Sequence, residues 1–325
     1  MYLHPDLRAV VEALPANTDL FADIPATRAA LKQAFVPPEP DPRITVTDRS
    51  IAGPAGQPLG LRIYKPSGAT EATPVVVWFH GGGFILGDLD TEDHNCRPMC
   101  AEFGVTVVSV DYRLAPEHRY PAGFDDCYHA LCWVVDNAQE LGVDPDRLAL
   151  AGHSSGGALV AATALAARDR QGPTIRYLFL GYPALDDRQE TPSSRTITDA
   201  RILNADRVGA LWDVYLGDTE PDAYAAPARA TDVSGLPPTY LLVTAVDPFR
   251  DEGLDWARRL VAADIPVEMH LVPGAPHMFD VYGAGTPLVD RAVIGWRDAL
   301  GHALHQQDSV ATTSEPRAVT SAGAR

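Results

Sequence analysis

The chain has 325 residues, of which 46% are hydrophobic, so it is long and apolar enough to bury a large core. Length alone predicts about two domains, although single α/β domains also reach this size. The formal net charge of −17 disfavours nucleic acid and anionic membranes as partners, because both are polyanions that would repel the chain.

The start of the chain, Met1–Asp6, has no basic segment followed by an apolar one, so no secretory signal is predicted. No apolar stretch approaches the roughly 18 to 20 residues that a membrane span requires. These features predict a soluble, cytoplasmic protein. The cysteines lie in two close pairs inside predicted helices, with a spacing that fits no common zinc pattern, and we interpret them as buried thiols rather than metal ligands. They are Cys96, Cys100, Cys127 and Cys132.

The first predicted strand is Ile44–Ile51, whose residues alternate in polarity, and Gly60–Tyr64 pairs with it across a turn rich in Gly and Pro. Continuous apolar runs then predict strands buried on both faces, and a last run, Val267–Val272, alternates. The buried runs are Val75–Phe79, Val105–Val110, Leu148–Ala151, Tyr177–Leu180 and Tyr240–Ala245.

Helical segments lie between these strands. They are Thr91–Phe103, Pro121–Glu140, Gly157–Arg170, Asp251–Ala263 and Leu288–His305. Because strands that alternate with helices imply parallel crossovers, we predict an α/β fold with a doubly wound sheet.

Two segments interrupt this alternation. Residues 1–42 contain amphipathic helical stretches, and residues 186–225 contain a helical segment, Ala205–Leu216. We interpret the two as a helical cap over the C-terminal edge of the sheet, where α/β ligand sites lie, with two unrelated surface insertions as the alternative. The predicted division is an N-terminal cap segment at 1–42, core at 43–185, cap insertion at 186–225, core at 226–305 and a disordered tail at 306–325.

A G-x-S-x-G pattern, Gly152–Gly156, lies between a predicted strand and a predicted helix. A serine on so sharp a turn has an exposed and strained position, and the flanking glycines relieve the crowding. Ser154 is therefore a candidate nucleophile. The motif alone is weak, since about one chain in ten of this length carries it by chance. The rest of the chain must supply a base, an acid and donors for an oxyanion.

His277 is the candidate base, because it is the only one of the ten histidines on a loop after the last predicted strand. Asp247 follows the preceding strand and is the candidate acid. Alternatively, the Asp247 carboxylate only stabilises the N-terminus of a helix and has no catalytic role. Asp186 and Asp187, which follow an earlier predicted strand, are the other candidates for the acid. The order Ser154, Asp247, His277 is the one expected for a nucleophile elbow on an α/β sheet.

Three successive glycines follow another predicted strand, in His80–Phe84. Bare backbone lets N–H groups approach a substrate carbonyl oxygen, so we predict an oxyanion hole formed by the N–H groups of Gly81, Gly82 and Ser155. By itself a triple glycine is most often a flexible loop. Its position after a strand, in a chain that also has the elbow, favours the functional interpretation.

Five ordered motifs resemble the hormone-sensitive-lipase family of bacterial carboxylesterases (bacterial family IV), and the resemblance covers roughly residues 5 to 305. The motifs are His80–Gly83, Asp111–Glu117, Gly152–Gly157, Asp247–Gly253 and His277. The resemblance implies the α/β-hydrolase fold with a mostly parallel, eight-stranded sheet and a mostly helical cap. It also implies hydrolysis of short- to medium-chain acyl esters without a cofactor. It favours Asp247 over Asp186 as the acid, gives Glu117 a structural role and suggests a homodimer.

The chain departs from the family pattern beside the nucleophile, where Asp and Ala are usual and His153 and Ser155 stand here. Ser155 acts through its backbone N–H, and we interpret His153 as replacing a structural hydrogen bond rather than joining proton transfer. Met278 stands where Gly often follows the catalytic histidine, which narrows the pocket. Candidate pocket residues, which core packing explains equally well, are Phe84, Leu86, His153, Trp212, Tyr215, Phe249, Met278 and Phe279.

We predict a serine carboxylesterase that forms an acyl-enzyme on Ser154, with a small ester as its partner. A deacetylase, lactonase or amidase would use the same side chains. A non-catalytic small-molecule receptor, like the plant gibberellin receptors that resemble this family, is an alternative from another class, as is an interaction protein. Those receptors lack the catalytic histidine, and a scaffold leaves a complete set of Ser154, Asp247 and His277 unexplained.

Overall fold

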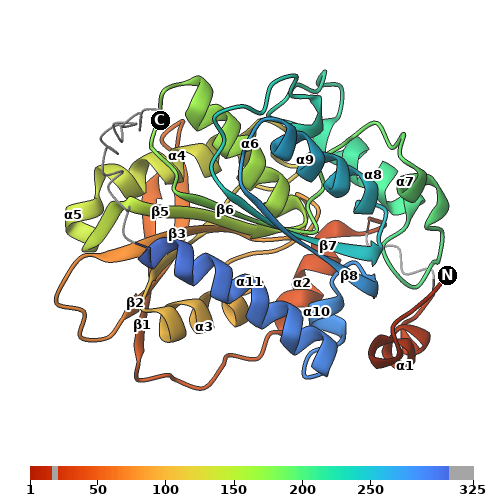
Figure 1. Cartoon of the computed structure of the whole chain (residues 1–325), viewed down its shortest axis with the longest axis horizontal. Coiled ribbons are helices and arrows are strands. Elements are labelled where there is room, and N and C mark those ends of the chain that lie inside the picture. The colour runs from red at the N-terminus through yellow and green to blue at the C-terminus, as the bar shows by residue number, and fades with distance from the viewer. Residues whose placement is uncertain (17–20, 307–325) are drawn as a thin grey trace, which may run out of the picture.

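The computed structural model describes residues 1–16 and 21–306. Within these residues, eight strands form one sheet in the order β1-β2-β4-β3-β5-β6-β7-β8 (Figure 1). The strand β2 is antiparallel to both of its neighbours, and the other pairs are parallel. The strands are β1 (Ile44–Ala52), β2 (Pro58–Pro66), β3 (Thr73–Phe79), β4 (Thr106–Asp111), β5 (Val143–His153), β6 (Tyr177–Gly181), β7 (Thr239–Val246) and β8 (Val267–Pro276).

Helices cover both faces of the sheet. In Figure 1, α4, α6 and α9 lie over one face, and α3 and α11 lie over the other. The helices are α1 (Pro5–Ala13), α2 (Ile24–Ala34), α3 (Asp93–Phe103), α4 (Ala122–Asp136), α5 (Ala138–Leu141), α6 (Ser155–Asp169), α7 (Pro192–Thr196), α8 (Ala205–Leu216), α9 (Arg250–Ala262), α10 (Phe279–Tyr282) and α11 (Pro287–His305). This arrangement confirms the predicted α/β-hydrolase fold.

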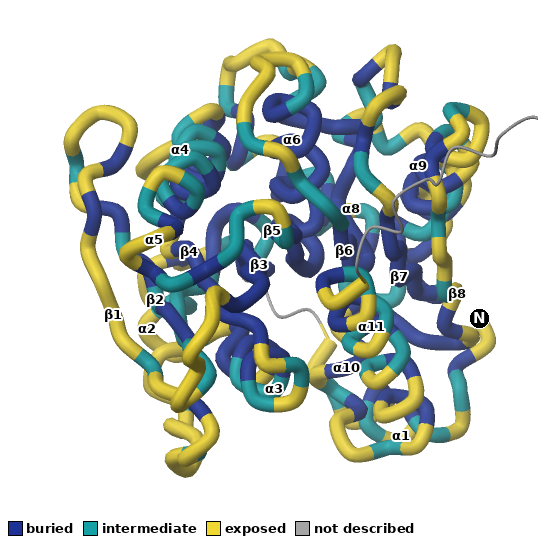
Figure 2. Tube along the Cα trace, turned by 60° about the vertical axis from the view of Figure 1, so that its left-hand side comes forward, coloured by how far each residue is buried: buried dark blue, intermediate teal, exposed yellow. Residues whose placement is uncertain are grey.

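The central strand β3 shows why the sheet has two cores. Every residue of β3 is buried. Because side chains alternate across a strand, Val75, Val77 and Phe79 enter the core beneath α4 and α6, whereas Val76 and Trp78 enter the core beneath α3 and α11. Figure 2 shows the same contrast along the sheet, with β3 buried in the centre and β1 largely exposed at the edge.

Several predicted boundaries differ from the observed ones. The strand β8 continues four residues beyond Val272, to Pro276, because its pairing with β7 extends the ladder through a segment rich in Gly and Pro. The single helix predicted over Pro121–Glu140 is interrupted at Asn137 and becomes α4 and α5. The short helices α7 and α10 were not predicted, since one turn leaves no periodic pattern in the sequence.

The two segments predicted to form a cap contact each other. Leu3 and Val11 of the N-terminal segment pack with Ile197 and Ile202 of the insertion, and Val246 at the end of β7 completes this small cluster. That the segments act together as a cap over the site stays a prediction. Residues 307–325 of the predicted disordered tail lie outside the described residues. Over the described ranges, the chain forms no helix of the length and hydrophobicity that crossing a membrane demands.

Removing the side chain of Trp296 should destabilise the core between α11 and the sheet. Trp296 is fully buried, stacks on Phe179 with ring centroids 4.4 Å apart and lies 5.7 Å from the ring of Trp78. We expect Trp296→Ala to lower the free energy of unfolding by about 3–5 kcal/mol, measured by urea unfolding. The matched control is Trp133→Ala, because Trp133 is only partly buried beneath Arg49. An equal decrease in the free energy of unfolding of the two variants would contradict this account of the core.

Candidate active site

Ser154 lies on a strained turn between β5 and α6, with φ 55° and ψ −121°. The turn passes close to the end of β3, and a Cβ atom on Gly152 would lie 2.6 Å from the carbonyl oxygen of Phe79. A Cβ atom on Gly156 would clash with the same carbonyl oxygen. Both glycines are therefore required by close backbone approach, and the strain at Ser154 is held by the packing around it.

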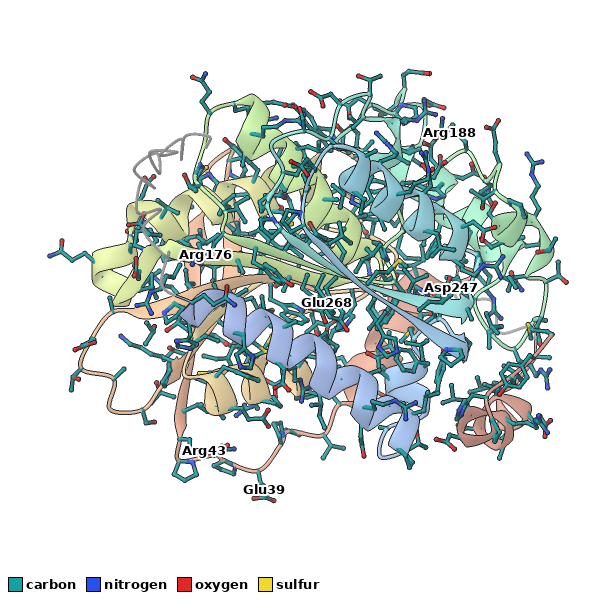
Figure 3. The ribbon with its side chains drawn as sticks, viewed as in Figure 1. Glu39, Arg43, Arg176, Arg188, Asp247 and Glu268 are labelled. Carbon is teal, nitrogen blue, oxygen red and sulfur yellow. The ribbon has the colours of Figure 1, made fainter. Side chains whose placement is uncertain are left out.

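His277 connects Ser154 to Asp247. Its Nε2 lies 2.9 Å from the Ser154 Oγ, and its Nδ1 lies 2.7 Å from the Asp247 Oδ2. All three side chains are at least nine-tenths buried. They come from three separate places in the chain, the turns after β5, β7 and β8. Figure 3 places Asp247 at the end of β7, beside the end of β8.

The carboxylate of Asp247 is held by two further donors. The Thr244 hydroxyl donates to its Oδ2 at 2.6 Å, and the backbone N–H of Phe249 donates to its Oδ1 at 3.0 Å. An acceptor fixed in this way keeps the Nδ1–H tautomer of His277 oriented, so that Nε2 is free to accept the proton of Ser154.

The competing carboxylates are occupied elsewhere. Asp186 forms a two-point ion pair with Arg188, at 2.7 and 2.9 Å. Asp187 pairs with Arg229 at 2.6 Å. The geometry therefore brings Asp247, and neither of these two, to His277.

The glycine loop after β3 is oriented by three contacts. The Tyr112 hydroxyl donates to the carbonyl of His80 at 2.8 Å, and the N–H of Gly81 donates to the Glu92 Oε1 at 3.2 Å. The His80 Nδ1 lies 2.7 Å from the carbonyl oxygen of Gly81. Since the C=O and N–H of a trans peptide point in opposite directions, this last contact turns the N–H of Gly82 away from His80.

These contacts correct one predicted donor. Gly81 was expected to supply an oxyanion N–H, but that N–H is engaged by Glu92. Within the described residues, no acceptor lies against the N–H of Gly82 or Gly83. Both have positive φ, at 121° and 64°, which favours glycine. Ser155 begins α6, where N–H groups have no partner inside the helix. Gly82, Gly83 and Ser155 therefore each have an N–H group that is not engaged by another of the described residues.

Several predicted pocket residues surround this loop. Phe84 stacks on Tyr215 with ring centroids 3.8 Å apart and lies 5.5 Å from the ring of Trp212, so helix α8 packs directly on the loop. Leu86 is buried in the same core. The ring of Phe249 lies edge-on to that of His277, at 5.3 Å. For these residues, lining the pocket stays a prediction.

Three further pocket candidates have different surroundings. Met278 follows His277 in the left-handed region, at φ 58°, and is 39% exposed. Phe279 is fully buried in the core beneath α3 and α11. The ring of His153 lies against the rings of Trp78 and Trp296 in that same core. For Met278, His153 and Phe279 too, lining the pocket stays a prediction.

Glu92 is a buried charged residue that the sequence did not single out. Its Oε2 lies 3.3 Å from the His153 Nδ1. Burial alone raises the pKa of Glu92, but the charge and hydrogen bond of His153 outweigh burial and lower this pKa to about 2. Burial alone lowers the pKa of His153, but Glu92 raises it above its ordinary value. In the sequence Glu92 looks like an ordinary acidic residue before a helix, and no pattern distinguishes it.

Burial was predicted for all four cysteines and is found for three. Cys96, Cys100 and Cys127 are buried, Cys132 is partly exposed, and none of the four forms a disulfide. Over residues 1–16 and 21–306, no group of three or more His, Cys, Asp or Glu side chains is placed to hold a metal ion.

Comparison with known proteins finds relatives of this chain in both sequence and structure. Residues 76–281 match the family model described as alpha/beta hydrolase fold. The chain is 40% identical over 308 residues to esterase LipI of Mycobacterium tuberculosis, covering 92% of this chain and 95% of that protein. It is 37% identical over 309 residues to carboxylesterase NlhH of the same species, covering 93% and 97%. The solved structure of a bacterial heroin esterase superposes with a TM-score of 0.88 at 36% identity, covering 94% of this chain and 99% of that one.

The Glu92–His153 pair should give the protein a pH-dependent stability. Because the pKa of Glu92 is lowered, its contribution is present above the ordinary value of 4.5 and is lost as pH falls toward 2. Because the pKa of His153 is raised, its contribution is complete below the ordinary value of 6.5 and is lost as pH rises through the folded-state pKa.

We therefore expect the free energy of unfolding of the wild type, relative to the double variant Glu92→Gln/His153→Asn, to be highest between these two values. Urea unfolding at pH 3, 5.5 and 9 measures it. The double variant is the reference because it removes both titrating groups and leaves every other group in place. If the difference in free energy of unfolding between the wild type and the double variant stays constant from pH 3 to pH 5.5, Glu92 and His153 do not form an ionised pair.

Proposed function

The chain belongs to the alpha/beta hydrolase fold family and is a carboxylic ester hydrolase of the hormone-sensitive-lipase type, and from this premise we propose that Ser154 is its nucleophile, acting on short- to medium-chain acyl esters. One observation carries the proposal. His277 stands between Ser154 and Asp247, at 2.9 Å from the hydroxyl and 2.7 Å from the carboxylate. This is the geometry that a serine requires to lose its proton as it attacks.

Acylation proceeds in two proton transfers. His277 Nε2 accepts the proton of Ser154 as the Oγ attacks the ester carbonyl carbon, and a tetrahedral intermediate forms. The imidazolium that results is stabilised by Asp247, which faces its Nδ1 at 2.7 Å. His277 then donates the proton to the leaving alkoxide, the C–O bond breaks, and the acyl group remains on Ser154.

The negative charge of the intermediate develops on the former carbonyl oxygen. We assign its stabilisation to the N–H groups of Gly82, Gly83 and Ser155, none of which is engaged by another of the described residues. These donors are held in place before the substrate arrives, so no reorganisation is needed when the charge forms. Gly83 takes the place expected for Gly81.

Deacylation repeats the same steps with water. His277 removes a proton from a water molecule, which attacks the acyl-enzyme carbonyl, and the proton then passes to the Ser154 Oγ as the acid is released. The proposed preference for short to medium acyl chains rests on the rings beside the glycine loop. Phe84, which follows this loop, packs with Trp212 and Tyr215, and we expect these three rings to limit the length of the acyl chain.

Replacing Ser154 by Ala should abolish esterase activity. We expect kcat to fall by about 10⁴-fold or more on nitrophenyl esters, because the nucleophile is lost while the fold is retained.

The wild-type protein should hydrolyse acetyl to hexanoyl esters faster than dodecanoyl esters. Each chain should react once with an organophosphonate. Absence of turnover and of labelling in the folded wild type would instead favour a non-catalytic receptor, and faster cleavage of matched anilides would favour an amidase.

The two candidate acids can be separated by matched substitutions. Asp247→Asn should lower kcat by about 10⁴-fold, because an amide at this position favours the wrong tautomer of His277. Asp186→Asn makes the same substitution at an aspartate that is paired with Arg188, and it should leave kcat within a few-fold of the wild type. Both variants are compared by ester hydrolysis after circular dichroism confirms folding. Inactivation by Asp186→Asn alone would overturn the assignment.

A further inference from the structure

Behind the nucleophile, a pair of buried charged residues links the glycine loop to the elbow. The two oxygens of Glu92 face different partners. Oε1 accepts the N–H of Gly81 at 3.2 Å, and Oε2 lies 3.3 Å from the His153 Nδ1. Because His153 immediately precedes Ser154, one carboxylate spans the loop that carries the oxyanion donors and the residue next to the nucleophile.

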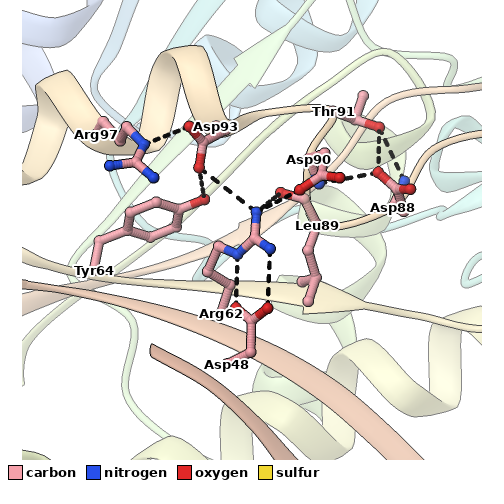
Figure 4. Close-up of polar contacts among 9 residues, drawn as sticks. All are labelled: Asp48, Arg62, Tyr64, Asp88, Leu89, Asp90, Thr91, Asp93 and Arg97. Carbon is pink, nitrogen blue, oxygen red and sulfur yellow. Dashed lines mark hydrogen bonds and ion pairs between the residues drawn. The ribbon is translucent and has the colours of Figure 1, made fainter. Parts of the chain in front are cut away.

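The backbone of Glu92 is itself fixed to the sheet. Figure 4 shows the Arg62 guanidinium of β2 between Asp48 of β1 and the loop that precedes Glu92. Arg62 donates to Asp48 at 2.7 Å and to Asp90 at 2.6 Å. Asp93, which follows Glu92, accepts from the Tyr64 hydroxyl at 2.8 Å. Glu92 is therefore attached on both sides to the antiparallel end of the sheet.

His153 is enclosed by rings and by charged groups of several elements. Its ring stacks on Tyr182 with centroids 5.0 Å apart and lies within 6 Å of the rings of Trp78, Phe179 and Trp296. The charged groups that face it are Glu92 before α3, Asp280 of α10 and Arg297 of α11. Its Nε2 lies 3.9 Å from the Asp280 Oδ2 and has no hydrogen-bond partner within the described residues.

The loop has little freedom to move once this pair is formed. A Cβ atom on Gly81 would lie 3.3 Å from the carbonyl oxygen of His153 and 3.7 Å from the Ser154 Cβ, so the loop already touches the elbow. Asn95 donates to the Glu92 Oε2 at 2.8 Å and keeps the carboxylate facing both partners. A shift of Glu92 would therefore shift Gly81, and with it the next peptide, which bears the N–H of Gly82.

We propose that Glu92 and His153 are positioning residues, an ion pair that sets the distance between the oxyanion donors and the Ser154 hydroxyl. This inference rests on the proposed function. Neither side chain touches the substrate. Their loss acts on the transition state, in which the donors meet a full negative charge, far more than on the bound ester, which carries none.

The test compares His153→Asn and Glu92→Gln, which each remove one charge and keep a polar side chain. We expect each variant to lower kcat by about tenfold, less than the 10²–10³ that loss of a whole donor causes, with KM within twofold of the wild type. Inhibition by a trifluoromethyl ketone, whose adduct on Ser154 places an oxyanion in the same hole, should weaken by a similar factor. Values of kcat are expressed per site titrated with an organophosphonate, so that unfolded protein does not count.

Two further variants make the comparison specific. The double variant Glu92→Gln/His153→Asn should be no slower than the slower single variant, because the two residues act as one unit. His270→Asn is the matched control, since His270 is a partly buried histidine on β8 outside this network, and it should change neither kcat nor ketone affinity by more than twofold.

The proposal is overturned if kcat and ketone affinity stay within twofold of the wild type in either single variant, if only KM changes, or if the two losses multiply in the double variant. If the His153→Asn protein does not react with the organophosphonate, the kcat, KM and ketone affinity of Glu92→Gln decide the proposal by the same criteria. Activity that survives Ser154→Ala would instead overturn the proposed function. Unchanged kinetics in the pair variants, beside an inactive Ser154→Ala, would overturn only the positioning role.

Discussion

The close approach of two neighbouring strand ends is the constraint on which the site depends. In the parallel ladder, Phe79 at the end of β3 is paired with Gly152 at the end of β5. The glycine loop and the nucleophile elbow leave the sheet from these two positions, so the ladder places them side by side. The contact exists only because Gly152 and Gly156 carry no side chain where the carbonyl of Phe79 passes. The glycine loop lies beside Ser154 as a consequence of this backbone packing.

The same principle operates between β7 and β8. Val246 at the end of β7 is paired with Pro276 at the end of β8, and the residues that follow these two strands are Asp247 and His277. The β7–β8 ladder thus brings Asp247 and His277, which are far apart in the chain, within hydrogen-bond distance. The rigid scaffold holds the geometry, and the turns supply the chemistry.

Charged residues lie on both sides of Ser154, and their contacts differ between the two sides. On one side, Asp247 orients His277 with the help of Thr244. On the other side, Glu92 and His153 form a pair that is almost fully buried. A buried pair of this kind contributes little net stability, because desolvation offsets the attraction, and specificity of geometry is the better-supported reason to keep one. Tyr182 separates the two histidines and contacts both rings.

The sequence by itself determined which residues lie at the ends of the strands. Ser154, Asp247 and His277 were predicted as site residues because each follows a predicted strand, and a strand, unlike a surface loop, leaves a local pattern of burial. The tertiary structure decided which groups those residues meet. That the N–H of Gly81 is taken by Glu92, that Asp187 is paired with Arg229, and that His153 lies among aromatic rings all depend on residues distant in the chain. Hydrogen bonding between such residues has no local signature, because it arises only when packing has removed the competing water.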